Sequence, residues 1–280
     1  MSKGFLIFAQ DSGIKKYTKC AYALALSLTK HIPDTNVSIV TDNDLPSKYG
    51  VVFDNIIPIP WRDYNNTNTT TYKTEDRWKL YHCSPYDETI VLDADMLVLS
   101  DLSHWWTYLD KYEIFFTSSV RDYRNRIATG RFYRKAFDSN QLPDLYSGLM
   151  YFKKTDFSKN FFSWVEYINN NWELFYGKYV NLNYPKVPSM DVTVSLVTKI
   201  LDCEEIVSHR DSVVTFTHMK SMLQGWENPT ESWQDSIGGY FNDKCQLKIG
   251  NYQQFGLFHY TEYSFLNDTI INHLEQDLGI

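Results

Sequence analysis

Two aspartates interrupt an otherwise apolar run near the middle of the chain. The run extends from Thr89 to Leu99, and Asp93 and Asp95 stand two residues apart within it. Such a run predicts a strand buried in a sheet, where carboxylates are costly unless they pair or bind a cation. We therefore expect the two side chains to hold a divalent metal at the end of a core strand. The alternative is a solvated turn, which is the usual meaning of an isolated Asp-X-Asp.

Alternating strands and helices predict the fold class, an α/β protein with a mostly parallel central sheet flanked by helices. Strands that end in polar residues are typical of such sheets, whose ligands bind beyond the carboxyl ends of the strands. The first half of the chain is expected to be Rossmann-like, and residues 213–218 and 246–260 to form a β-rich C-terminal portion. The expected strands are 4–10, 37–41, 56–59, 89–92, 114–117 and 148–152, and the expected helices are 18–31, 73–83 and 190–201.

Composition indicates an ordinary folded globule, because 43% of the 280 residues are apolar and only 22% are charged. The 16% aromatic content suggests a cleft that stacks on sugars or bases. No apolar stretch is long enough for a membrane span, so neither secretion nor membrane insertion is expected. The cysteines form no CxxC pair, which favours reduced thiols in a cytoplasmic protein; they are Cys20, Cys83, Cys203 and Cys245.

A basic window stands out against the net charge of −7. Its cations alternate with aromatic residues such as Tyr123, as binding of a phosphodiester backbone and unstacked bases would require. The alternative is a solvated helix face. The basic residues of this window are Arg121, Arg124, Arg126, Arg131, Arg134 and Lys135.

The segment Thr-Ile-Val-Leu-Asp-Ala-Asp-Met-Leu-Val-Leu-Ser-Asp-Leu at residues 89–102 resembles the signature strand of GT-A glycosyltransferases, especially family 8. That family includes glycogenin and bacterial lipopolysaccharide galactosyltransferases. The resemblance implies a single GT-A domain over residues 1–280, with a nucleotide-sugar-binding half (1–117) and an acceptor-side half (118–280). It also implies a hexosyl- or pentosyltransferase that uses Mn²⁺ or Mg²⁺ and a nucleotide sugar, most naturally a UDP-sugar.

The resemblance further implies a donor site assembled from separate segments. The end of the first strand is expected to cradle the base and ribose, and Arg77, or alternatively Lys79, to contact the donor. Lys220 is a candidate for the cation near the phosphates. The full expected donor set is Ala9, Gln10, Tyr17, Asp42, Arg77, Lys79, Asp93, Ala94, Asp95 and Lys220.

Two more stretches resemble family elements beside the transferred sugar. They make Ser147, Gly148 and Asp191 the expected catalytic residues, with Asp191 orienting sugar hydroxyls; alternatively, Asp191 caps the helix that follows it. Tyr146 stands where the family has Asn, and Val192 where it has Gln.

The segment 256–260 resembles the C-terminal strand whose histidine completes the metal site in that family. His259 is therefore expected to join Asp93 and Asp95 as a metal ligand, and His218 is its competitor.

The chain also resembles glycosyltransferases encoded by tailed phages, which decorate hydroxymethylated pyrimidines in DNA or glycans of the host. Together with the basic window, this implies modified DNA as the acceptor, with lipopolysaccharide or another glycan as the equal rival, and a bacterial cytoplasmic location. A nucleotide-sugar-binding or pyrophosphorylase-like protein is a third possibility. Pyrophosphorylases usually carry a glycine-rich basic loop after the first strand, whereas residues 10–16 contain one glycine.

Overall fold

The computed structural model describes residues 1–61, 75–128, 134–180, 188–220, 223 and 232–280. A central sheet of six strands has the order β3-β2-β1-β4-β7-β6. Strands β1 to β4 run parallel to one another, and β7 runs antiparallel to both of its neighbours, β4 and β6. The strands are β1 (Lys3–Phe8), β2 (Val37–Val40), β3 (Asn55–Ile57), β4 (Glu88–Asp93), β6 (Ile114–Thr117) and β7 (Tyr146–Lys153).

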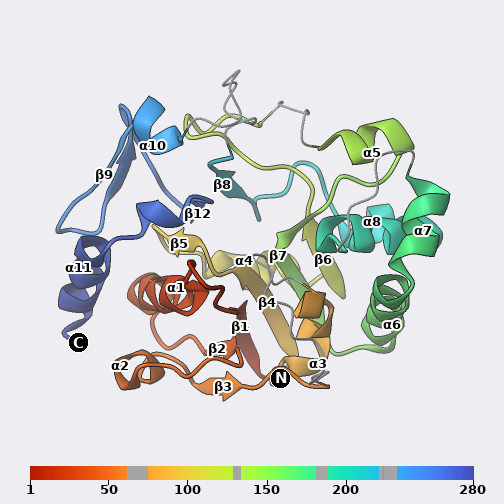
Figure 1. Cartoon of the computed structure of the whole chain (residues 1–280), viewed down its shortest axis with the longest axis horizontal. Coiled ribbons are helices and arrows are strands. Elements are labelled where there is room, and N and C mark those ends of the chain that lie inside the picture. Colours follow the sequence, from red (N-terminus) through yellow and green to blue (C-terminus); the bar gives the residue numbers. More distant parts are fainter. Residues whose placement is uncertain (62–74, 129–133, 181–187, 221–222, 224–231) are drawn as a thin grey trace.

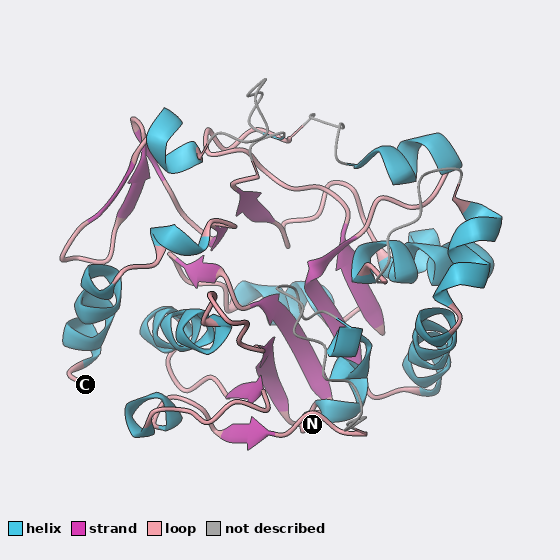
Figure 2. Cartoon of the chain, in the orientation of Figure 1, coloured by secondary structure: helices cyan, strands magenta, loops and turns pink. Residues whose placement is uncertain are grey.

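Helices cover both faces of this sheet (Figures 1 and 2). Alternate residues of β1 point to opposite sides, so that Phe5 and Ile7 enter the core beneath α1, while Leu6 and Phe8 enter the core beneath α6 and α8. The predicted α/β class with a mostly parallel, helix-flanked sheet is confirmed. The helices are α1 (Tyr17–His31), α2 (Ser47–Gly50), α3 (Leu80–Cys83), α4 (His104–Leu109), α5 (Lys135–Asn140), α6 (Asp156–Asn170), α7 (Trp172–Tyr179), α8 (Met190–Ile200), α9 (Glu204–Val207), α10 (Trp233–Ser236) and α11 (Asp268–Leu278).

Two small sheets extend the structure beyond the carboxyl end of β4. In one, β5 (Met96–Val98) lies beside β12 (Leu257–His259), which also pairs with β8 (Phe216–His218). The other is antiparallel and contains β9 (Gly239–Phe241), β10 (Leu247–Ile249) and β11 (Tyr252–Gln253). Because β5 follows β4 after a two-residue turn, the acidic pair lies where the central sheet meets the β5-β12-β8 sheet (Figure 1).

The strand register fixes which residues gather at the functional edge. Phe8 of β1 pairs with Val40 of β2 on one side and with Asp93 of β4 on the other. The carboxyl ends of these three strands are therefore level, and the polar residues that follow them share one edge.

Some boundaries differ from the expectation. Within the described part of the predicted helix 73–83, a 3₁₀ turn (η1, Glu75–Lys79) precedes the short α3, and residues 73–74 lie outside the described ranges. The division at residue 117 stays a prediction; β7, from the second half, is paired with β4 inside the central sheet.

All four cysteines are buried free thiols. None of the helices in the described ranges combines the length and apolarity needed to cross a bilayer.

The packing of Tyr86 over Gly4 of β1 gives a stability prediction. A Cβ at residue 4 would overlap the buried Tyr86 ring, whose hydroxyl is hydrogen-bonded to Ser38 at 2.6 Å. Gly4→Ala should lower the free energy of unfolding by about 1–3 kcal/mol, as overpacking typically does. Gly13→Ala is the matched control, because among the described residues nothing lies within 4 Å of its Cβ position. Equal urea midpoints for the two variants would contradict the prediction.

Candidate active site

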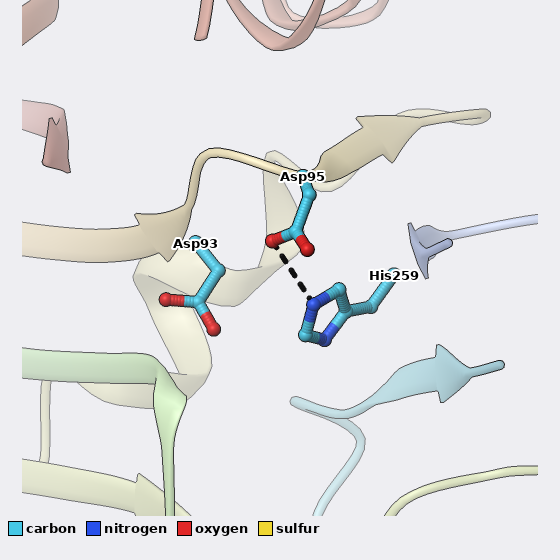
Figure 3. A group of neighbouring side chains, drawn as sticks. All are labelled: Asp93, Asp95 and His259. Atoms are coloured by element: carbon cyan, nitrogen blue, oxygen red, sulfur yellow. Dashed lines mark hydrogen bonds and ion pairs between the residues drawn. The ribbon is translucent and has the colours of Figure 1, made fainter. Parts of the chain in front are cut away.

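Three side chains predicted as metal ligands meet at the junction of the two sheets (Figure 3). Asp93 ends β4, Asp95 lies in the turn to β5, and His259 ends β12, opposite Met96. His259 Nε2 lies 3.0 Å from Asp95 Oδ1. One potential ligand atom from each of the three residues lies within 4.8 Å of the others. Residues 164 positions apart are thus brought to one point by strand pairing.

Backbone contacts hold this arrangement. The Tyr260 amide donates to the Asp95 carbonyl at 3.2 Å, which fastens the end of β12 to the acidic turn. The Met219 amide donates to the His259 carbonyl at 3.0 Å, which fastens the residue after β8 to the same place.

Each carboxylate has its own cationic neighbour. Burial raises the pKa of Asp93, and this effect outweighs the opposing influence of Arg77, whose guanidinium lies 2.7 Å from Asp93 Oδ1. Burial acts in the same direction on Asp95, but contact with His259 outweighs it and lowers the pKa of Asp95. For His259 itself, burial favours the neutral ring, but the pair with Asp95 raises its pKa.

The donor set fits a divalent cation. Carboxylate oxygens suit Mg²⁺ and Mn²⁺, and an imidazole nitrogen is well tolerated by Mn²⁺. His259 Nδ1 is buried and, within the described ranges, has no hydrogen-bond partner. Nε2 is the ring nitrogen that faces Asp95 (Figure 3), so an ion held with the aspartates would bind Nε2, and Nδ1 is left to an outer partner.

Gly148 of β7 permits the close approach to Asp93. A Cβ there would lie 2.6 Å from Asp93 Oδ2 and 3.4 Å from the Met96 methyl carbon. Only glycine leaves room for the carboxylate at this position, so the strand with the expected catalytic residues passes directly beside the acidic pair.

Arg77 and Lys79 are separated by the structure. Arg77 contacts Asp93 and also donates to the Ser147 carbonyl at 3.2 Å. Lys79 is buried, pairs with Asp76 at 2.5 Å and donates to the Trp61 carbonyl at 3.3 Å. Of these two alternatives, Arg77 is the cation at the acidic pair.

Asp191 lies in the first turn of α8 but does not cap that helix. The N-cap residue is Ser189, and Asp191 Oδ1 instead accepts hydrogen bonds from the amide and the hydroxyl of Ser147, at 2.8 and 2.6 Å. Its Oδ2 accepts from Arg134 at 2.6 Å. The structure therefore joins Asp191 and Ser147 as neighbours, with Gly148 next to them.

The expected base-binding residues follow the level strand ends. The Ala9 amide donates to the Val40 carbonyl at 3.0 Å, and Gln10 is the next residue. Asp42 follows β2 and accepts from the Ile59 amide at 3.0 Å. Tyr17 begins α1, and Ala94 is buried in the acidic turn. Their donor contacts stay a prediction.

His218 packs against His259 of the Asp93, Asp95 and His259 cluster, and Lys220 lies within electrostatic reach of Asp95. The His218 ring stacks on His259 with centroids 4.7 Å apart, and burial holds its pKa well below the usual value. Of the two histidines, His259 is the one grouped with the aspartates. Lys220, two residues after His218, interacts electrostatically with Asp191 and Asp95.

The basic window divides into an exposed and a buried part. The Arg121 carbonyl accepts from the His218 amide at 2.9 Å, which attaches the window to β8. Arg124, Arg126 and Lys135 are exposed, and Arg121 is half-buried. Arg131 lies outside the described residues.

Arg134 departs from the expectation for this window. Only 2% of its surface is exposed, and it contacts Asp144 and Asp191. This burial removes Arg134 from the cations that can meet an external polyanion. Asp144 could not be predicted as its partner, since no spacing rule links an aspartate to an arginine ten residues earlier on the other side of helix α5.

No protein-family profile matches the sequence, and no curated protein matches it in sequence. Solved structures do resemble the fold. The glycosyltransferase GlyE of Streptococcus pneumoniae TIGR4 gives a TM-score of 0.53 at 11% identity, over the whole of this chain and 64% of GlyE. This chain thus spans less than two thirds of GlyE.

Two other solved structures are similar. The galactosyltransferase LgtC, solved with donor and acceptor sugar analogues, gives a TM-score of 0.54 at 14% identity over 98% of this chain and 95% of LgtC. Mouse xyloside xylosyltransferase 1 gives 0.52 at 12% identity over 93% and 98%. At these identities the similarity shows a shared fold, the GT-A arrangement expected from the sequence.

The three-residue cluster gives a binding prediction. Asp95→Asn should weaken Mn²⁺ binding by at least about tenfold, a loss that even changes in outer-shell partners produce. Isothermal titration calorimetry of the whole chain with Mn²⁺ measures this. Asp243→Asn, at an exposed aspartate in the β9–β10 loop, is the matched control and should bind as the wild type does. An unchanged affinity in Asp95→Asn would remove Asp95 from the ligand set.

Proposed function

We propose that the protein is a metal-dependent glycosyltransferase that moves a sugar from a nucleoside diphosphate sugar, UDP-linked above all, to an acceptor hydroxyl. The observation that carries the proposal is the Asp93, Asp95 and His259 cluster at the carboxyl edge of the central sheet. The similarity of the fold to glycosyltransferases supports it. Because fold alone does not decide function, the weight rests on the cluster.

Asp93, Asp95 and His259 would hold Mn²⁺ or Mg²⁺. A bound divalent ion neutralises the charge that develops on a departing diphosphate. Arg77 adds a fixed positive charge next to Asp93. Asp191 and Ser147, which are hydrogen-bonded to each other, offer oxygens to the hydroxyls of the sugar. The remaining requirement is to hold the acceptor hydroxyl within about 3–3.5 Å of the sugar carbon.

The activity can be tested without knowing the acceptor. We expect the purified protein to release UDP slowly from at least one UDP-sugar of a panel, only with Mn²⁺ or Mg²⁺, and the Asp95→Asn variant to release none. The exposed-aspartate variant Asp243→Asn should match the wild type. Formation of pyrophosphate from UTP would instead favour the pyrophosphorylase-like alternative. No turnover of any donor would contradict the proposal.

The sharper part of the proposal is a hydroxymethylated pyrimidine in DNA as the acceptor, in a phage-encoded enzyme of the family 8 type. Exposed Arg124 and Arg126 lie on a turn joined to β8, the strand of His218. The Arg124 guanidinium lies 4.8 Å from the centre of the Tyr123 ring. The exposed cations of this turn suit phosphates, whereas the Tyr123 ring is buried and is not open to a base. Buried free thiols agree with a location in the bacterial cytoplasm. A lipopolysaccharide or other glycan is the rival acceptor, and LgtC was solved with an acceptor sugar analogue.

An Arg124→Gln/Arg126→Gln double variant should raise KM for hydroxymethylcytosine DNA. The salt dependence of binding should also fall by about two units of slope, one for each lost phosphate contact. Nucleoside mass spectrometry measures transfer, and Lys244→Gln at another exposed cation is the control. Transfer to glycans but never to DNA would leave the glycan acceptor in place and overturn the DNA acceptor.

A further inference from the structure

Arg134 occupies an enclosed position between β7 and α8. Its guanidinium carbon lies 3.7 Å from the centre of the Phe137 ring and 4.1 Å from that of the Tyr146 ring. Its nitrogens donate to the Asp144 carboxylate, to the Leu145 carbonyl at 2.6 Å and to Asp191 Oδ2 at 2.6 Å. Only arginine offers a planar fork with donors for three acceptors at once, and lysine cannot reproduce this geometry.

The two acids bound by Arg134 differ in their exposure. Asp144 is 16% exposed in its side chain, whereas Asp191 is 28% exposed, although three hydrogen bonds hold its two oxygens. Each carboxylate oxygen has two lone pairs, so a partly exposed aspartate can accept further hydrogen bonds from a ligand.

The same arginine is in contact with the metal side of the site. Tyr146, beneath the guanidinium, meets the His218 ring edge-on at 6.2 Å, and His218 stacks on His259. The cation and rings form a continuous packed column between Asp191 and the Asp93, Asp95 and His259 cluster.

We propose that Arg134 is a positioning residue: it fixes the carboxylate of Asp191, ionised and in one orientation, so that Asp191 accepts hydrogen bonds from hydroxyls of the transferred sugar. The inference rests on the proposed function. Several charged groups act on Asp191: Arg134 on one side, Lys220 after β8, and Asp93 across the site. Burial alone would raise the pKa of Asp191, but Arg134 and then the Ser147 hydrogen bonds lower it below its usual value.

Two substitutions of Arg134 distinguish the effect of its positive charge on Asp191 from the effect of its hydrogen-bonding geometry. In Arg134→Gln the pKa of Asp191 should rise, as NMR titration of ¹³C-labelled aspartate carboxyls measures, and kcat of Mn²⁺-dependent UDP-sugar turnover should fall at least tenfold. Arg134→Lys keeps a positive charge but not the fork. Its Asp191 pKa should stay near that of the wild type while kcat still falls. Binding of UDP with Mn²⁺ should be unchanged in both variants, and Arg210→Gln, at an exposed arginine, is the matched control.

A double variant distinguishes an effect of Arg134 through Asp191 from a general loss of folded protein. If Arg134 acts through Asp191, Arg134→Gln should cost no further activity in an Asp191→Asn background. Multiplicative losses in the double variant, or an Asp191 pKa that does not change in Arg134→Gln, would overturn the inference. Should Arg134→Gln fail to fold, unchanged kcat in folded Arg134→Lys would overturn it as well.

Failure of the proposed function can be distinguished from failure of the inference about Arg134. If the wild type turns over no nucleotide sugar, both the function and the catalytic meaning of Arg134 are overturned. NMR titration of ¹³C-labelled aspartate carboxyls distinguishes the cases, because it reports the pKa of Asp191 directly. An active wild type in which that pKa does not respond to Arg134→Gln overturns the positioning inference alone.

Discussion

Placing two carboxylates at the end of a buried strand is the constraint on which the site depends. Removing charge from water is costly unless each charge is paired. Here Asp93 is paired with Arg77, and Asp95 with His259. These partners come from segments on either side in the sequence, η1 and β12. The charge at the junction thus ties the central sheet to the C-terminal strands, and the same pairing leaves oxygens that an ion can use.

Asp191 is a further carboxylate whose charge is paired inside the protein, here with Arg134. Asp191 is held by Arg134 and Ser147, and part of its side chain stays exposed. The glycine at position 148 lets β7 bring this position beside Asp93. Two carboxylate centres, one suited to a cation and one suited to hydroxyls, therefore lie along one strand edge. In the proposed function, these two centres would recognise the charged and the neutral end of a sugar diphosphate separately.

Strands with long apolar runs were predictable, because burial on both faces leaves a continuous signal in the chain. Helix α6 was missed even though Thr155 caps it and apolar residues recur at helical spacing from Phe161 to Ile168. The basic window was predicted as one acceptor surface, since neighbouring charges look alike in sequence. In the structure, Arg134 is buried and the next cation of the window is exposed, because α5 begins directly after Arg134 and places Phe137 against the Arg134 guanidinium.

The sequence by itself determined the alternation of strands and helices and the acidic pair that ends a core strand, because both are local patterns of burial and charge. Tertiary structure alone decided which histidine joins the pair, which of Arg77 and Lys79 faces it, and that Arg134 holds Asp191. These choices depend on strand register and on side chains brought together from distant segments. Contacts of that kind leave no periodic trace in a single chain.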